Sequence, residues 1–213
     1  RGANGVIIVT TKRGSEGRND VTVNAYVGVQ QIAKRLEMLN AREYAVMLNQ
    51  QDVLSNQEPS IENPSVYGKG TDWQDEILRL AFMQNYQVAA SGGNKDGRYY
   101  LSLSMFDQDG VIKNSGIRRY QTRLNLDRKM RHNINIGANF QFSYTQREPN
   151  LVSLGGFDYQ SSALATPPTM NIYNEDGSYA SDSPSRVVSN DIDNVVAQLN
   201  ERKKQEKAAS IYA

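Results

Sequence analysis

Strict alternation of apolar and polar residues is the dominant pattern of this chain. It is clearest over residues 134–145, where apolar side chains occupy the even positions from Ile134 to Tyr144 and Asn, Gly, Gln, Ser or Thr the odd ones. Successive side chains of a strand point to opposite faces, so a period of two predicts β-strands with two unlike faces. Similar alternation predicts strands at 21–30, 86–91, 99–105, 119–127 and near 207–211.

The connectors between these strands differ regularly in length. Short turns are expected at 92–97 and 129–133, a moderate connector at 107–118, and long connectors at about 32–82 and 149–203. Tight turns that alternate with long loops are typical of transmembrane β-barrels. One surface helix is expected over 40–54, where Asn40 precedes apolar residues at helical spacing. The second long connector, rich in Pro, Ser, Asn and Asp, is expected to be irregular.

A transmembrane barrel and a soluble antiparallel sandwich both show such alternation. The polar positions here are mostly Gln, Asn, Ser, Thr and Gly with some Arg, which suits a hydrated lumen. The longest runs match the roughly nine to eleven residues that a tilted strand needs to cross a bilayer. Tyrosines near strand ends suit an interfacial girdle: Tyr86, Tyr99, Tyr120 and Tyr144. Periodicity alone leaves the barrel and a carbohydrate-binding sandwich open.

The composition excludes some classes of function but does not identify the function. The 24 Lys and Arg residues nearly balance the 23 Asp and Glu residues, for a net charge of +1, so a nucleic-acid partner is not indicated. The absence of Cys excludes disulfide scaffolds and thiol chemistry. No apolar run approaches the roughly 18 residues of a spanning helix. Because the chain opens on Arg1 without a signal peptide, it is expected to be an internal piece of a longer protein.

No set of residues forms a credible catalytic or metal site. His132 is the only histidine, and the sequence therefore supports neither a histidine-based catalytic triad nor a histidine-based metal site. Asp-Gly pairs at 109–110 and 176–177 lack the rest of a calcium loop and are expected to be turns. Acidic residues near Trp73 are expected to be solvated. The sequence therefore predicts neither an enzyme nor a bound cofactor.

The N-terminal segment carries a specific family resemblance. Residues 1–14, Arg-Gly-Ala-Asn-Gly-Val-Ile-Ile-Val-Thr-Thr-Lys-Arg-Gly, resemble the end of the plug in SusC/RagA-type TonB-dependent transporters. Further stretches fit the same family in order: 37–45, 70–77, 84–87, 91–93, 107–112, 119–120, 124–127, 167–168 and 176–179. The resemblance covers nearly the whole chain.

This resemblance implies an all-β fold: part of a transmembrane antiparallel β-barrel, from a 22-stranded barrel with a plugged lumen. Residues 1–14 would end the plug domain, 15–20 would be a linker, and 21–213 would begin the barrel, with extracellular loops at about 32–82 and 149–203. The implied function is TonB-dependent import of glycans or peptides across the outer membrane of a Gram-negative bacterium. A SusD-like surface lipoprotein and outer-membrane lipid would be its partners, and TonB would bind outside these residues. A siderophore or cobalamin receptor is the alternative within TonB-dependent transporters.

Three groups of candidate residues follow from the resemblance and the strand pattern. The plug turn would be formed by Arg1, Gly2, Asn4 and Gly5. Side chains expected to face the lumen are Arg119, Arg123, Asn125, Asn139 and Gln141. The two arginines are expected to contact the plug, with an anionic substrate as the alternative. The loop aromatic Trp73 is expected to anchor its loop on the barrel rim, and stacking on a sugar is the alternative.

Overall fold

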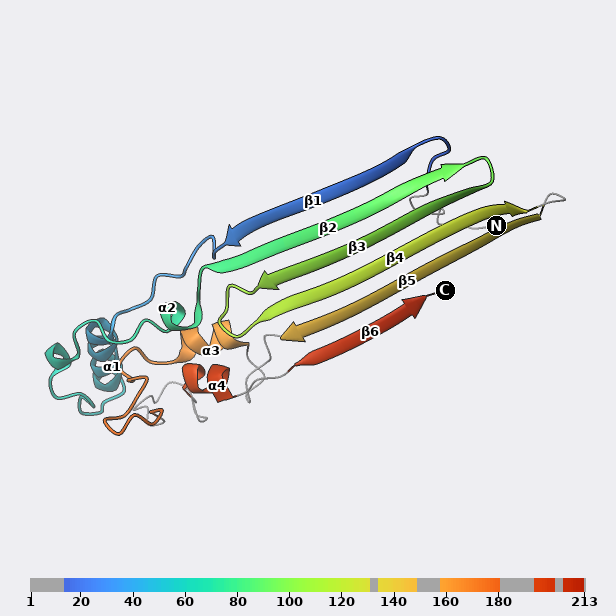
Figure 1. The fold of residues 1–213 in the computed structure, drawn as a ribbon. Helices are drawn as coiled ribbons and strands as arrows, with labels where there is room; N and C mark the ends of the chain where they lie inside the picture. Colours follow the sequence, from blue (N-terminus) through green and yellow to red (C-terminus); the bar gives the residue numbers. More distant parts are fainter. Residues whose placement is uncertain (1–13, 131–133, 149–157, 181–193, 202–204, 213) are drawn as a thin grey trace, which may run out of the picture.

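The six strands of the described residues lie in one antiparallel sheet, in which each strand pairs with its neighbour in sequence (Figure 1). The computed structural model describes residues 14–130, 134–148, 158–180, 194–201 and 205–212. The strands are β1 (Asn19–Gln30), β2 (Ala81–Asn94), β3 (Gly97–Asp109), β4 (Gly116–Met130), β5 (Ile134–Glu148) and β6 (Glu206–Tyr212). The predicted strands are thus confirmed, and the two-sheet sandwich is not the fold.

Most strands extend beyond their predicted limits, and the connectors are correspondingly shorter. β2 runs through Gly92 and Gly93, so the turn to β3 contains only Lys95 and Asp96. The Asn94 side chain accepts hydrogen bonds there from the backbone N–H groups of Asp96 and Gly97, at 2.9 and 3.0 Å. The expected turn at 92–97 was too wide because backbone pairing continues where apolar alternation ends. For the same reason the connector expected at 107–118 is reduced to 110–115.

The apolar runs of the strands lie on one face of the sheet. Directly paired residues point to the same side, and the pairing joins Val21, Ala90, Leu101, Leu124 and Phe140 into one row across five strands. A second row contains Ala25, Tyr86, Met105, Tyr120, Tyr144 and Ala209. This apolar face is open, as the 74% exposure of Val21 shows.

The apolar band crosses the sheet diagonally. On β1 it runs from Val21 to Val29, whereas on β5 it runs from Ile134 to Tyr144, although Tyr144 shares a row with Ala25. The centre of the band therefore shifts by about five residues, or about 17 Å, over four strand spacings of about 4.8 Å. If the band lies parallel to the plane of a membrane, the strands are tilted by about 40° from the membrane normal, within the 35–45° range of transmembrane barrels.

The linker reaches β1 at the end of the sheet that carries the Lys95-Asp96 turn. Gly14 is buried, and a side chain there would collide with the backbone carbonyls of Gly92 and Tyr99. Gly17 has a φ of 74° and donates its N–H to the Gly93 carbonyl at 2.9 Å. Because residues 1–13 lie outside the described range, the division into plug, linker and barrel stays a prediction.

The two long connectors fold together at the opposite end of the sheet, as the cluster of helices in Figure 1 shows. We call this body, residues 31–80 with 158–180 and 194–201, the cap. Its helices are α1 (Ala41–Leu54), η1 (Pro64–Tyr67), α2 (Trp73–Ile77), α3 (Tyr159–Ala165) and α4 (Val195–Glu201). No helix among the described residues is long and apolar enough to cross a membrane.

The prediction of a helix over 40–54 is confirmed by α1. Asn40 and Glu43 form a capping box, in which each side chain accepts from the other residue's backbone N–H, at 2.9 and 3.0 Å. The expectation of a single loop helix was wrong, and the second connector, expected to be irregular, contains α3 and α4 among its described residues. The missed helices have five to seven residues, two turns at most, which is too short to establish a helical period.

The core of the cap joins both connectors to the β3–β4 turn. Its buried residues are Trp73, Ile77, Leu78, Tyr159, Ala163, Met170, Ala180, Val195, Val196 and Leu199, with Ile32, Ile112, Ile172 and Tyr179 packed around them. The backbone N–H of Lys113 donates to the Ile77 carbonyl at 2.8 Å, and the Asn114 side chain donates to Leu199 at 3.0 Å. The cap is therefore attached to the sheet.

Candidate functional site

The polar face of the sheet carries all five predicted lumen residues. Asn125 pairs directly with Asn139, and Arg123 with Gln141. The Arg123 guanidinium donates to the Gln141 side-chain oxygen at 3.1 Å. Arg119 lies two residue pairs further toward the cap on the same face, beyond the pair of Gln121 and Ser143. The pairing thus brings these residues together on one surface, and whether that surface borders a lumen remains a prediction.

Burial on this polar face is greatest near the linker end of the sheet. Asn125 is 5% exposed and Tyr100, its direct neighbour on β3, is 8% exposed. Gly14 lies against the backbone of Tyr99 and Gly92 at the same end. The polar face is thus closely packed toward the linker and more open at Arg119, toward the cap.

Arg119 and Arg123, the two arginines predicted to face the lumen, are not neutralised by carboxylates of the described residues. The ion pairs there join Arg18 with Asp20, Arg35 with Asp75, Arg79 with Asp109, and Arg118 with Asp107. Neither Arg119 nor Arg123 takes part in one within this part of the chain. A guanidinium without a carboxylate partner is available to a carboxylate or another anion.

Trp73 lies inside the cap. Its side chain is 3% exposed, and its indole N–H donates to the carbonyl of Pro167 at 2.9 Å. The neighbouring Asp72 is exposed, as expected, and also caps α2 by accepting from the backbone N–H groups of Gln74 and Asp75. The indole therefore offers no open face to a sugar.

An exposed aromatic pair that sequence reasoning missed lies on the second connector. The rings of Tyr173 and Tyr179 stack with centroids 5.2 Å apart, and Tyr173 is 51% exposed. The turn between them holds the Asp-Gly pair at 176–177, as predicted, and closes a bridge between the two tyrosines. Tyrosines flanking an Asp-Gly turn were the signal for a short hairpin.

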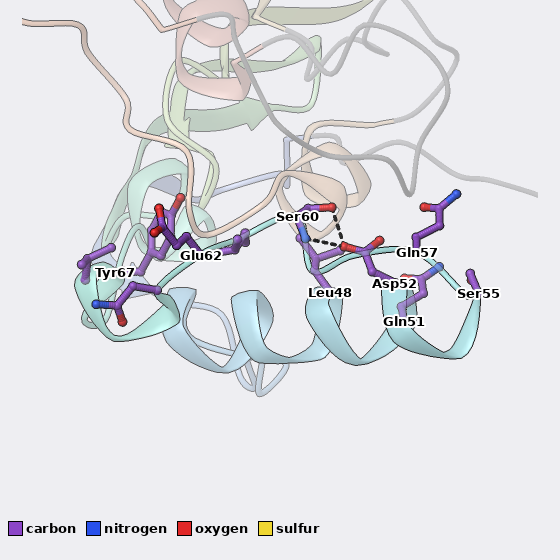
Figure 2. A pocket seen from close by; sticks show the side chains of 11 residues that line it. Leu48, Gln51, Asp52, Ser55, Gln57, Ser60, Glu62 and Tyr67 are labelled. Atoms are coloured by element: carbon purple, nitrogen blue, oxygen red, sulfur yellow. Dashed lines mark hydrogen bonds between the residues drawn. The ribbon is translucent and has the colours of Figure 1, made fainter.

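The described residues of the cap form three cavities of similar size, the third of which lies on the outer side of α1, between Val46, Leu54 and Pro59. The first, of about 580 Å³, lies between the connectors and is lined by Leu36, 38–40, 69–74 and 163–168, with Tyr44 and Met47. The second, of about 590 Å³, lies between α1 and residues 55–67 (Figure 2). We call this second cavity the trough. The first two have sizes typical of small-molecule sites.

The N-cap of α3 makes part of the cap sensitive to acid. A hydrogen bond from the backbone N–H of Ser161, at 2.7 Å, holds the pKa of the Asp158 carboxyl below its usual value. The carboxylate therefore stabilises α3 above the unfolded pKa of about 3.9, and this contribution is lost as pH falls through the folded pKa. Asp158→Ala should cost about 0.5–2 kcal/mol of helix stability, and Asp158→Asn should keep the cap without the pH dependence. Amide exchange at Ser161 and Ser162, corrected for intrinsic rates, measures both effects.

Some predicted features lie outside the described residues. These are the plug turn, Arg1, Gly2, Asn4 and Gly5, and also His132. Among the residues that are described, no group of three or more His, Cys, Asp or Glu side chains could hold a metal ion.

Two curated proteins show clear sequence similarity to the chain. It is 34% identical over 220 residues to TonB-dependent receptor P26 of Formosa agariphila, covering 100% of this chain and 21% of that protein. It is 32% identical over 183 residues to TonB-dependent receptor SusC of Bacteroides thetaiotaomicron, covering 84% of this chain and 17% of that protein. The chain therefore spans about a fifth of the length of these relatives. No protein-family model matches it.

The fold resembles that of a solved transporter. The RagAB peptide importer in its closed-closed state superposes with a TM-score of 0.66 at 21% identity, over 89% of this chain and 25% of the importer chain. The open-open state gives a TM-score of 0.59 at 22% identity. Sequence similarity along the whole chain and an independently matching fold lead to one family: the chain belongs to the TonB-dependent receptors of the SusC/RagA type.

Proposed function

We propose that this chain forms the first six strands of a TonB-dependent transporter in the outer membrane of a Gram-negative bacterium. The complete protein would import glycans or peptides and would work with a SusD-like surface lipoprotein. Two findings support this: one relative is the TonB-dependent receptor SusC, and the RagAB complex of matching fold is a peptide importer. TonB itself would bind a segment outside the described residues.

The diagonal apolar band is the observation that carries this proposal. A band of constant height, inclined by about 40° to the rows of paired residues, is what lipid requires from strands tilted by the same angle. On β4 and β5, Tyr120 and Tyr144 limit the band on the cap side, since the next row on the same face contains Arg118 and Gln146 there. Aromatic residues at the upper limit of an apolar band are typical of a membrane interface.

The opposite face of the sheet would then line the lumen. Arg119, Arg123, Asn125, Asn139 and Gln141 would face the plug, whose last residues we assign to 1–14. The unpaired guanidinium groups would bind carboxylates of the plug, or an anionic substrate as the second possibility. The cap would lie on the extracellular side, where a lipoprotein and an incoming substrate can reach it.

Cysteine labelling of the full-length protein on intact cells tests this orientation. Ser65→Cys, in the cap, should react with a membrane-impermeant maleimide, because residue 65 is exposed at the end proposed to be extracellular. Lys95→Cys, in the β2–β3 turn, should react only after the outer membrane is permeabilised. Labelling of Lys95→Cys on intact cells together with protection of Ser65→Cys would reverse the topology and refute the proposal.

A further inference from the structure

The trough between α1 and residues 55–67 has no role in the proposed transport path through the sheet. Figure 2 shows that it is elongated, with Tyr67 and Glu62 toward one end and Gln51, Ser55 and Gln57 toward the other. We infer that the trough is a binding site for an uncharged oligosaccharide chain.

The outer wall of the trough is fixed to α1 by side-chain hydrogen bonds. Asn49 donates to the Ile61 carbonyl at 2.7 Å and accepts from the Ile61 N–H at 3.0 Å. The Asp52 carboxylate accepts from the backbone N–H of Ser60 at 2.8 Å and also from the Ser60 hydroxyl (Figure 2). Asn56, with a φ of 55°, turns the chain directly after α1. Because these contacts exist without a ligand, binding requires little ordering of the wall.

The lining combines an apolar floor with neutral and acidic polar groups. Leu48 and Ile61 form the buried floor. The side chains of Gln51, Glu62 and Tyr67 form no hydrogen bond with the described residues, so their polar groups are available to a ligand. A sugar chain presents C–H faces to an apolar or aromatic surface and hydroxyls that both donate and accept. Amide, carboxylate and phenol groups around an apolar floor match that chemistry.

Other ligand classes fit the trough less well. No Lys or Arg lines it, whereas the carboxylates of Asp52 and Glu62 do, so an anionic chain such as an oligouronate would be repelled. An extended peptide needs free backbone groups along a strand edge. The N–H groups of Ser60 and Ile61 are already bonded to side chains of α1. An uncharged sugar chain therefore remains the best match.

The experiment uses the full-length receptor purified in detergent, titrated calorimetrically with uncharged hexasaccharides: α-1,4-glucan, β-1,4-glucan, β-1,4-xylan and β-1,4-mannan. A hexauronate and a Gly-Ser-Ala hexapeptide serve as comparisons. At least one uncharged hexasaccharide should bind, and Tyr67→Ala should weaken that binding at least about tenfold and Gln51→Ala about fivefold. Gln50→Ala, the adjacent residue that does not line the trough, should change nothing. Equal folded yields and thermal stabilities establish that the variants are intact.

The inference is overturned if no uncharged hexasaccharide binds, or if binding is unchanged in both Gln51→Ala and Tyr67→Ala. Binding of the hexauronate or the peptide that both substitutions weaken would also overturn it, by assigning the trough to another ligand. The inference rests on the proposed function only in placing the cap outside the cell. Reversed cysteine labelling would refute the proposed function, but it would not change sugar binding to the trough of the purified receptor. The failure of the proposed function and the failure of the trough inference are therefore distinguishable.

Discussion

Replacing Ala25 by arginine is expected to prevent stable insertion of the barrel, whereas arginine at Asn24 is expected to be tolerated. Ala25 lies at the middle of the apolar run of β1, between Val21 and Val29, and pairs with Tyr86. An arginine facing the bilayer midplane costs about 2–4 kcal/mol. Asn24 lies on the polar face, where its substitute would contact water. Heat-modifiable migration of the folded protein on a denaturing gel measures the outcome. Equal folded fractions for the two variants would contradict the assignment of the faces.

A second pair of variants tests the strand tilt. Ala138 and Asn19 share one row of the sheet, which passes through Gly92, Tyr99 and Leu126. Because the band crosses the rows diagonally, Ala138 lies near its middle on β5, while Asn19 lies beyond its limit on β1. Ala138→Arg should therefore be as damaging as Ala25→Arg, and Asn19→Arg nearly neutral. Similar damage at both positions of the row would show that the band is not inclined.

Truncation of Trp73 to alanine is expected to destabilise both connectors of the cap at once. The indole is buried in the shared core and bonded to Pro167, 94 residues away in sequence. Losing a buried tryptophan costs about 3–5 kcal/mol. Local opening should accelerate amide exchange at least about 100-fold, since every 1.4 kcal/mol is tenfold. The reporter is Thr71, whose N–H donates to the Pro168 carbonyl at 2.9 Å.

Two further variants separate the contributions of Trp73. Trp73→Phe keeps most of the apolar volume but removes the indole donor from the Pro167 carbonyl, which still accepts from the N–H of Met170 at 3.1 Å, so a smaller cost of about 0.5–1.5 kcal/mol is expected. Leu54→Ala, at a position 86% exposed at the end of α1, should have no effect. Faster exchange confined to the first connector in Trp73→Ala would mean that the two connectors are not coupled through this core.

The strands could be predicted from sequence because their chemistry repeats every second residue. On β5 the alternation continues without interruption from Ile134 to Thr145, and no other regular structure uses this period. The limits of the strands were harder to predict. Arg128 and Lys129 extend β4 past the apolar band, where pairing depends on backbone groups that the side-chain pattern does not reveal.

The cap was beyond sequence reasoning for a different reason. Its core residues come from short segments far apart in sequence, such as Trp73, Met170 and Val195. Each segment contributes one or two apolar side chains, so no local period marks it as part of a core. The burial of Trp73 could be predicted in part, since the sequence favoured an anchoring role for its side chain over stacking on a sugar. The trough could not be predicted from the sequence, because its lining depends on how residues 55–67 fold back over α1.

The core shared by the two connectors also determines when the cap can form during folding. The contact between Trp73 and Pro167 spans strands β2 to β5, and the contact between Asn114 and Leu199 spans β4 and β5. Closing such long loops in an unpaired chain costs entropy that a few contacts do not offset. Pairing of consecutive strands, joined by turns as short as Lys95-Asp96, brings these segments together first. The cap is therefore a late-folding element, and its completion marks a sheet whose strands are already in register.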